Sequence, residues 1–407
     1  MIDADNWGRA FPYYRRVSHP VNRNELDPHL ERAVRNLYPR GFTDTYDSFI
    51  TLCTLGSIQN AFRRTSRTQP APGQQLPQPR PLRYDWVFID EASQVSEVDI
   101  LSLFSLLSTT LNEVQGFPRI SFLGDPIQIG PYASGPPSIF KLVQQCSFFD
   151  RLIARNVPSC PGPNTVQCIV LDRQFRMHPH ISALVNRISG RTTETMICGA
   201  TPWMLEHPQY YNRTYDGLLP NLCNNVDFAN PVIWFDPYAR FAENSNFAPY
   251  VELAQQHASG REYSVMELVC TLLICRHLLH HGIIQHPRDI LILTCYSRQK
   301  SLLRRVLDHG LQDILPFREE FRQACIRTID TAEGAEARTV IFCPGRDPTL
   351  NSAVGETSHL NSLRKLHVLA SRAQRRLFFI GSRQFFRDNC PTWAAALDFF
   401  DMDPANI

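Results

Sequence analysis

Short apolar runs alternate with amphipathic stretches along most of the chain, and polar residues close each run. Runs this short, bounded by polar turns, are typical of strands buried on both faces of a parallel sheet. The runs read FITLCTLG at 49–56, WVFID at 86–90, RISFLGD at 119–125, CIVLD at 168–172, PVIWFD at 231–236, DILILT at 289–294, TVIFC at 339–343 and RLFFIG at 376–381. They predict the strands of one or more parallel sheets.

Helical periodicity follows some of these runs. In two stretches, 181–188 and 366–373, apolar residues recur at positions i, i+3, i+4 and i+7. This spacing gives a helix one apolar face. A further helix is expected around 264–280. Strand–helix alternation of this kind predicts an α/β fold in which helices cover both faces of the sheet.

Two polar stretches interrupt the pattern and predict the domain organisation. Residues 65–83 are rich in Pro and Gln and lack apolar periodicity, which indicates a surface insertion between two strands. Residues 155–164, RNVPSCPGPN, indicate a boundary between domains. We therefore expect a first domain at 1–160, a second domain at 161–395 and a tail at 396–407.

Composition narrows the class of protein. Hydrophobic residues make up 43% of the chain and charged residues 20%, as in globular proteins, and no apolar stretch is long enough to span a bilayer. The formal net charge is only +2, so any nucleic-acid surface must be local. The 12 cysteines are scattered without the spacing of a metal site, which predicts reduced thiols rather than disulfides or bound zinc.

Carboxylates stand at the ends of two predicted strands. Asp90 and Glu91 follow WVFI, and Asp125 follows RISFLG, with Gln128 three residues later. Ligands collect at the carboxyl ends of strands in open α/β sheets. There one carboxylate can hold Mg²⁺ on nucleotide phosphates while its neighbour orients the attacking water. A single acidic pair would be equally consistent with a capped strand end, but two successive strands that end in this way favour a nucleotide site.

Six ordered segments carry a family resemblance. They are DEASQ at 90–94, GDPIQIGP at 124–131, LDRQFRMHP at 171–179, ILTCYSRQKSLLRRVL at 292–307, TIDTAEGAEARTVIFC at 328–343 and LNSLRKLHVLASRAQRRLFFIG at 360–381. In this order they resemble motifs II, III and IV, the TPYxxQ strand with its following helix, and motifs V and VI of superfamily 1 helicases, in the branch that contains senataxin and the nonsense-mediated-decay helicase. The resemblance implies two RecA-like P-loop NTPase-type domains with parallel sheets, and the use of ATP and Mg²⁺.

The resemblance implies a catalytic role for five residues. Asp90 would hold Mg²⁺, Glu91 would polarise the attacking water, and Gln128 would sense the γ-phosphate. Arg176 and Arg372 would be arginine fingers that reach the phosphates from the second domain. A guanidinium suits this task because it is always charged and can bridge phosphate oxygens with two hydrogen bonds.

The resemblance also implies binding residues around these five. Gly124 and Asp125 belong to the nucleotide site at the end of the second acidic strand, and Gly334 and Glu336 would lie beside the ribose and γ-phosphate. Tyr296 would stack on the adenine, although a tyrosine in the core is an equal alternative. Residues that would touch the nucleic-acid backbone without reading its sequence are Thr54, Pro131 and Thr328.

Some residues depart from the family pattern. Glu333 replaces the usual glutamine of motif V, which removes a donor and adds repulsion near phosphate, and Phe175 replaces a tyrosine. The largest departure is that GxxxxGK[ST], the P-loop that cradles β- and γ-phosphates, does not occur. Its lysine has no equivalent among Lys141, Lys300 and Lys365. We therefore expect the first RecA-like domain to be incomplete at its N-terminal side.

Two functions remain open from the sequence. The first is an ATP-dependent helicase or translocase present as a truncated core, whose own ATPase activity is doubtful and whose P-loop would come from a partner or an upstream segment. The alternative is an inactive helicase-like protein that binds nucleic acid or protein partners. In either case the expected ligand is single-stranded RNA or DNA, with no membrane, and the expected location is the nucleus or the cytoplasm. Residues 190–285 carry no motif.

Overall fold

The computed structural model describes residues 14–17, 50–53, 55, 85–108, 117–133, 138–155, 168–190, 197–198, 230–238, 263–280, 284, 286, 289–309, 326–332, 334–346, 348 and 360–401. The chain forms two compact units, the first from residues 1–126 and 130–166 and the second from residues 127–129 and 167–407. Each unit is α/β with parallel strands, as the sequence predicts. The predicted insertion at 65–83 and Thr54 lie outside the described residues.

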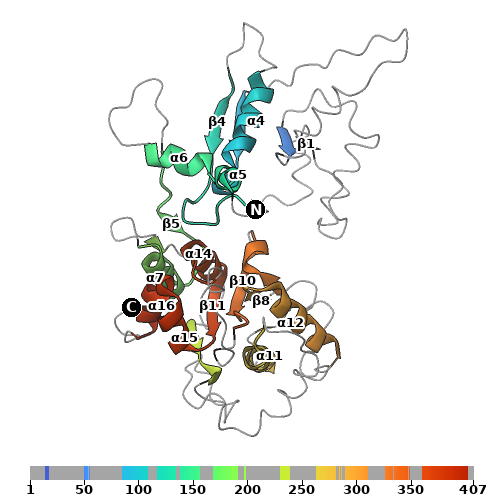
Figure 1. The fold of residues 1–407 in the computed structure, drawn as a ribbon, viewed down its shortest axis with the longest axis vertical. Helices are drawn as coiled ribbons and strands as arrows, with labels where there is room; N and C mark the ends of the chain where they lie inside the picture. The colour runs from blue at the N-terminus through green and yellow to red at the C-terminus, as the bar shows by residue number, and fades with distance from the viewer. Residues whose placement is uncertain are drawn as a thin grey trace, which may run out of the picture. The chain divides into compact units, whose positions relative to one another are not determined.

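A five-stranded parallel sheet forms the centre of the second unit (Figure 1). Its strand order is β7–β11–β10–β8–β9, and all neighbouring strands are parallel. The strands are β7 (Val232–Phe235), β8 (Ile290–Thr294), β9 (Ile326–Thr328), β10 (Ala337–Phe342) and β11 (Ala373–Ile380). β8 is buried along its whole length, as expected for a central strand whose two faces are both covered.

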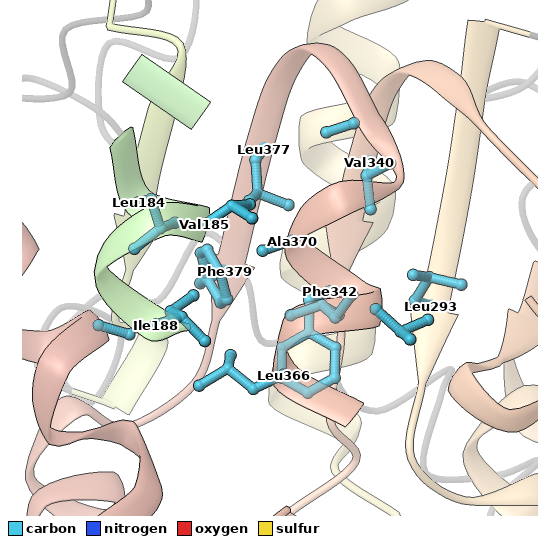
Figure 2. Close-up of a cluster of buried hydrophobic side chains, with 14 of the residues drawn as sticks. Leu184, Val185, Ile188, Leu293, Val340, Phe342, Leu366, Ala370, Leu377 and Phe379 are labelled. Atoms are coloured by element: carbon cyan, nitrogen blue, oxygen red, sulfur yellow. The ribbon is translucent and has the colours of Figure 1, made fainter. Parts of the chain in front are cut away.

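Helices cover both faces of this sheet. On one face, α11 (Val265–His280) and α12 (Ser297–His309) pack against Ile290 and Ile292 of β8. On the other face, Leu291 and Leu293 of the same strand share a core with α7 (Pro179–Ile188) and α14 (Leu363–Ser371). Figure 2 shows this second core, in which the helix residues Leu184, Val185, Leu366 and Ala370 surround Phe342 and Phe379. The alternation of faces along β8 is the period-two pattern of a strand.

Three short helices complete the second unit. They are α15 (Arg383–Asn389), η8 (Pro391–Trp393) and α16 (Ala394–Asp401). α16 buries Ala396, Leu397 and Phe399, so residues 396–401 belong to the core of the unit, whereas the sequence pattern placed them in a tail. The apolar spacing of these three residues supplies the face that α16 turns to the core.

The first unit is built around β3 (Trp86–Ile89) and β4 (Arg119–Phe122), which pair in parallel. Between them lie η2 (Ala92–Gln94) and α4 (Glu97–Ser108), and α5 (Ile139–Gln144) and α6 (Phe148–Arg155) follow. The core joins Ile89 to Ile100, Leu103 and Leu107 of α4. β1 (Tyr14–Val17) and β2 (Ile50–Cys53) form a separate parallel pair.

Two expectations of secondary structure need correction. Residues 168–172, CIVLD, are exposed and do not form a strand; the only pairing of this segment is between the two-residue strands β5 (Arg173–Gln174) and β6 (Ile197–Cys198) within the described residues. The predicted helical stripe at 366–373 also ends early, because α14 stops at Ser371 and Ala373 begins β11. The helices at 181–188 and around 264–280 are confirmed. No described helix is long and apolar enough to cross a membrane.

Candidate functional site

The acidic pair lies in a tight turn at the carboxyl end of β3. The backbone N–H of Glu91 donates a hydrogen bond to Oδ1 of Asp90 at 3.0 Å, and Nε2 of Gln94 donates to Oε2 of Glu91 at 3.3 Å. Glu91 has φ 50° and ψ 41°, the left-handed conformation, which no other non-glycine residue adopts within the described ranges. This conformation is unfavourable for a side chain with a Cβ atom and is often found at functional sites.

Gly124 brings the end of β4 against this turn. The N–H of Ala92 donates to the carbonyl of Leu123 at 2.8 Å. A Cβ atom on Gly124 would lie 3.1 Å from the backbone nitrogen of Ser93 and 3.2 Å from that of Ala92, closer than nearly all real contacts. A side chain at this position would therefore require the backbone of η2 to shift by a few tenths of an ångström. Gln128 does not belong to the same unit as Asp90, Glu91 and Gly124. The segment Ile127–Ile129 that contains it is part of the second unit.

The chemistry of these carboxylates fits a magnesium ion. Asp90 is exposed at the end of β3, and Asp125 follows the paired strand β4. Mg²⁺ is commonly held by one or two carboxylates together with substrate phosphates and water. No group of three or more metal-binding side chains occurs within the described parts of the chain.

The backbone strain at Glu91 can be tested by mutation. We expect Glu91→Gly to be more stable than Glu91→Ala by about 1 kcal/mol, because glycine adopts the left-handed conformation without a steric penalty. The loss of the carboxylate is common to both variants and cancels in the comparison. Urea denaturation of the full chain would measure the difference; an alanine variant as stable as the glycine variant would contradict the strain.

Arg176 contacts Glu336 and the end of α14 within the second unit. Its Nε lies 2.6 Å from Oε2 of Glu336, and its Nη1 donates to the carbonyl of Ser371 at 3.4 Å. Glu336 directly precedes β10, and Ser371 ends α14 beside Arg372. Three segments far apart in the sequence therefore converge at the amino ends of β10 and β11. Both charged side chains are a little over 40% exposed, so the ion pair can open at little cost.

Gln174 holds the loop that carries Arg176, a role that the sequence did not reveal. Its Oε1 accepts hydrogen bonds from the backbone N–H of Arg176 at 2.9 Å and of Met177 at 2.7 Å, and its Nε2 donates to the carbonyl of Met177 at 3.0 Å. The side chain is buried. A buried amide that satisfies three backbone groups fixes the direction of the loop. A neutral amide within the motif at 171–179 was its one sequence signal.

The second predicted arginine finger is not extended toward solvent. Arg372 is 3% exposed. Its Nε donates to the carbonyl of Val368 at 3.1 Å, and its Nη2 donates to Oγ of Ser371 at 3.2 Å. The guanidinium thus sits on the carboxyl end of α14, where the helix dipole favours a positive charge. The side chain would have to leave this position to reach a phosphate.

His178 anchors the same loop to the sheet. Its backbone N–H donates to the carbonyl of Gln374 at 2.7 Å, and its Nδ1 accepts from the N–H of His180 at 3.1 Å, which caps α7. Nε2 of Gln374 in turn donates to Glu336 at 3.1 Å. Burial, then the positive charges of His180 and Arg376, lower the pKa of His178 from 6.5 to about 4.

Tyr296 and Thr328 lie at the carboxyl ends of the strands, opposite the amino ends at which Arg176 and Glu336 meet. Tyr296 follows the carboxyl end of β8, and Thr328 pairs with Thr294 at the end of β9. Glu336 precedes the amino end of β10, and the six residues of that strand span about 20 Å. The structure therefore does not bring Tyr296 to the cluster of Arg176 and Glu336. Its side chain is half-buried, which leaves the core alternative open.

The remaining predicted residues have less defined surroundings. Gly334 is exposed with φ 70°, a conformation that favours glycine. Pro131 is buried in the first unit. Oγ1 of Thr328 is 3.0 Å from Oγ1 of Thr331. Seven cysteines of the described residues are free, as predicted, and burial raises the pKa of Cys343 to about 12, so it is no nucleophile at neutral pH.

Known proteins resemble most of the chain. A family profile described as an AAA domain matches residues 144–384. The helicase required for RNAi-mediated heterochromatin assembly 1 of Schizosaccharomyces pombe is 24% identical over 76% of this chain and 25% of its own length. The mouse protein 5′-3′ DNA helicase ZGRF1 is 23% identical over 76% of this chain and 13% of its own.

Among solved structures, the arterivirus nonstructural protein 10 helicase in complex with DNA aligns with a TM-score of 0.36 and 13% identity, over 96% of this chain and 53% of that one. The present chain spans about a quarter or less of the length of these curated relatives. The family profile covers more than half of the chain, and the relatives are named as helicases. This chain belongs to the AAA domain family, in its superfamily 1 helicase-like branch.

Proposed function

We propose that this chain forms part of an ATP-driven superfamily 1 helicase or translocase, in which the second unit recognises the nucleotide phosphates and the nucleic acid. The observation that carries the proposal is the convergence of Arg176, Glu336 and the end of α14 at one edge of the sheet. These residues belong to three motifs, and Arg176 contacts the other two, which lie 160 and 195 positions further along the chain. A solvent-exposed guanidinium already held in place is suited to accept phosphate oxygens.

Glu336 would act as a resting partner for Arg176. A nucleotide phosphate carries more charge than a carboxylate and offers several acceptor oxygens, so it can displace Glu336 from Arg176. The freed carboxylate would then be available to the ribose hydroxyls. In the first unit, Asp90 would hold Mg²⁺, which neutralises phosphate charge when bound, and Glu91 would orient the water.

The missing P-loop motif limits what the chain does alone. Without its lysine and its glycine-rich backbone cradle, the β- and γ-phosphates lack their main binding site. We propose that a partner or another segment supplies it. The burial of Arg372 favours the second candidate function, an inactive helicase-like protein that binds nucleic acid or protein partners.

A hydrolysis assay of the purified chain tests whether the missing P-loop abolishes its ATPase activity. We expect ATP turnover by the 407 residues to stay at the background rate with or without single-stranded nucleic acid, because the P-loop is absent. Glu91→Gln, which keeps the size of the side chain but removes the general base, should then have no effect. A phosphate-release assay would measure both proteins. Robust turnover that Glu91→Gln abolishes would show that this chain is a complete ATPase.

The ligand and location follow as further proposals. One relative is named as a DNA helicase and another is named for a role in RNAi, so we propose single-stranded DNA or RNA as the ligand class. A nuclear or cytoplasmic location would suit either ligand. Fluorescence anisotropy with labelled 20-nucleotide DNA and RNA strands would measure binding; no binding of either strand would contradict the proposed function.

A further inference from the structure

The short helix α5 of the first unit buries none of its side chains. Its four apolar residues are between 47% and 78% exposed: Ile139, Phe140, Leu142 and Val143. The helix nevertheless has a defined start, because Oγ of Ser138 accepts the backbone N–H of Lys141 at 3.2 Å. Short helices are marginal in water, and in proteins they are stabilised mainly by the packing of an apolar face. α5 therefore presents an apolar face that no described part of the chain covers.

Backbone contacts hold the end of α5 against the start of α4 (Figure 1). The N–H of Glu97, the first residue of α4, donates to the carbonyl of Cys146, two residues after α5, at 2.9 Å. Next to it, Ser96 and Ser147 form an antiparallel bridge. Two apolar residues of α4 are also about half exposed: Val98 and Leu101. The exposed apolar residues thus stand on two helices that are fixed to each other.

The structure of this surface indicates the shape of its occupant. Contiguous exposed apolar residues mark sites at which another protein binds. The backbone groups of α4 and α5 are used within the helices, so a partner strand has no free sheet edge here to pair with. An amphipathic helix needs only apolar contact, which it makes with residues at positions i, i+3, i+4 and i+7. A helix is therefore the element that fits.

The charge of the surface indicates which helix. Lys141 is the only charged residue of α5. A second copy of the chain docked through the same surface would bring two Lys141 side chains into one interface, where like charges repel each other. The Pro- and Gln-rich stretch at 65–83 contains three arginines and no acidic residue, so the same repulsion applies to it. A helix that carries acidic residues beside its apolar face is attracted instead.

We propose that α4 and α5 bind an amphipathic, acidic helix of a partner protein, with its apolar face on Ile139, Phe140 and Leu142 and its carboxylates beside Lys141. The site lies outside the six segments that resemble helicase motifs. It goes beyond the proposed function, because it requires neither ATP nor nucleic acid. Burial of apolar surface supplies most of the affinity, and charge determines which helices bind.

Three labelled peptides that differ only in charge test the proposal. Each has about 18 residues, the same leucine face at positions i, i+3, i+4 and i+7, and alanine with Glu, Gln or Lys elsewhere. Fluorescence anisotropy with the full chain would measure their dissociation constants. We expect the acidic peptide to bind about fivefold more tightly than the basic one, and Lys141→Glu to reverse this order.

Substitutions of the apolar residues locate the binding site. Phe140→Ser and Leu142→Ser should each weaken binding of the acidic peptide about tenfold, as expected for anchor residues of an interface. Phe88→Ser is the matched control, since Phe88 is an exposed phenylalanine of the same unit that lies on β3. It should leave the affinity unchanged. Circular dichroism of each variant shows that it is folded, and Lys141→Glu tests the surface without removing an apolar side chain.

Other results would overturn the proposal. Binding of none of the peptides, or equal losses in Phe88→Ser and the α5 variants, would show that α5 is no docking site for such a helix. Analytical ultracentrifugation of wild type tests the second copy as occupant. A dimer that Phe140→Ser dissociates would assign the surface to self-association instead. None of these results bears on ATP turnover or on the binding of nucleic acid, so the proposed function stands or fails separately.

Discussion

Trp393→Ala is expected to destabilise the second unit by about 3–5 kcal/mol, the usual cost of deleting a large buried aromatic side chain. Trp393 is 2% exposed. Its ring stacks on that of Phe342 with the ring centroids 5.6 Å apart, and the ring centroid of Phe386 is 4.5 Å away. Its Nε1 donates to the carbonyl of Leu360 at 2.8 Å. The substitution would leave a cavity beneath β10 and an unpaired carbonyl, and both add to the cost.

Calorimetry of the full chain would measure this loss. For a unit of this size, about 1 kcal/mol shifts the melting temperature by about 2–4 °C, so the expected decrease is about 6–20 °C. Trp393→Phe is the control. It keeps an aromatic ring and most of the volume, and it loses the hydrogen bond to Leu360. A change of less than about 1 kcal/mol for Trp393→Ala would show that η8 and α16 are not integral to the unit.

This prediction concerns a segment that sequence reasoning undervalued. The motifs end near Gly381, and residues 396–407 were expected to form a tail. Phe399 and Leu397 are instead buried against the second core. A short helix with three apolar residues contains too few turns for its periodicity to be recognised alone. Burial there depends on a surface formed by α7, which is distant in the sequence.

Strands were predictable where they are central and less so elsewhere. The runs that became β8, β10 and β11 are apolar on both faces because helices cover both sides. CIVLD at 168–172 has the same composition, yet Ile169 and Leu171 are exposed and unpaired within the described region. Composition reports that a segment can be buried in a sheet; whether a neighbouring strand edge exists is a property of the whole fold.

In the candidate site, too, some features were predictable from the sequence and others depend on the whole fold. Motif order indicated the residue types, including Arg176 and Glu336, which the structure brings together. It could not indicate that Arg372 would cap its own helix, because capping depends on where α14 ends. The edge on which Tyr296 lies was also hidden, since it follows from strand register rather than from spacing along the chain.

The stability of the second unit is expected to fall as pH decreases from about 6.5 to about 4, and His178 is the cause. Its pKa is about 4 in the folded chain and 6.5 in the unfolded reference. The unfolded chain therefore binds more protons in this range, and stability rises with pH there. The contribution of neutral His178 is complete above pH 6.5 and is lost as pH falls through the window. At pH 5 the loss amounts to about 2 kcal/mol.

Protonation of His178 has a structural consequence for the site. A protonated Nδ1 can no longer accept the N–H of His180, so α7 loses its cap. The same residue joins the loop of Gln174 and Arg176 to Gln374, which in turn contacts Glu336. Acid conditions should therefore loosen the loop that holds Arg176 before the sheet itself unfolds. The affected hydrogen bonds lie at the amino ends of β10 and β11, outside the core of the sheet.

His178→Asn tests this pH dependence, because asparagine caps helices well but does not titrate. Urea denaturation of wild type and variant at pH 7.5 and pH 5 would give the free energy of unfolding at each pH. We expect wild type to lose about 2 kcal/mol more than the variant on acidification. The comparison at pH 7.5, where His178 is neutral in both states, isolates any effect of the substitution on packing and capping. Equal losses in the two proteins would assign the acid sensitivity to other groups and leave His178 with a structural role only.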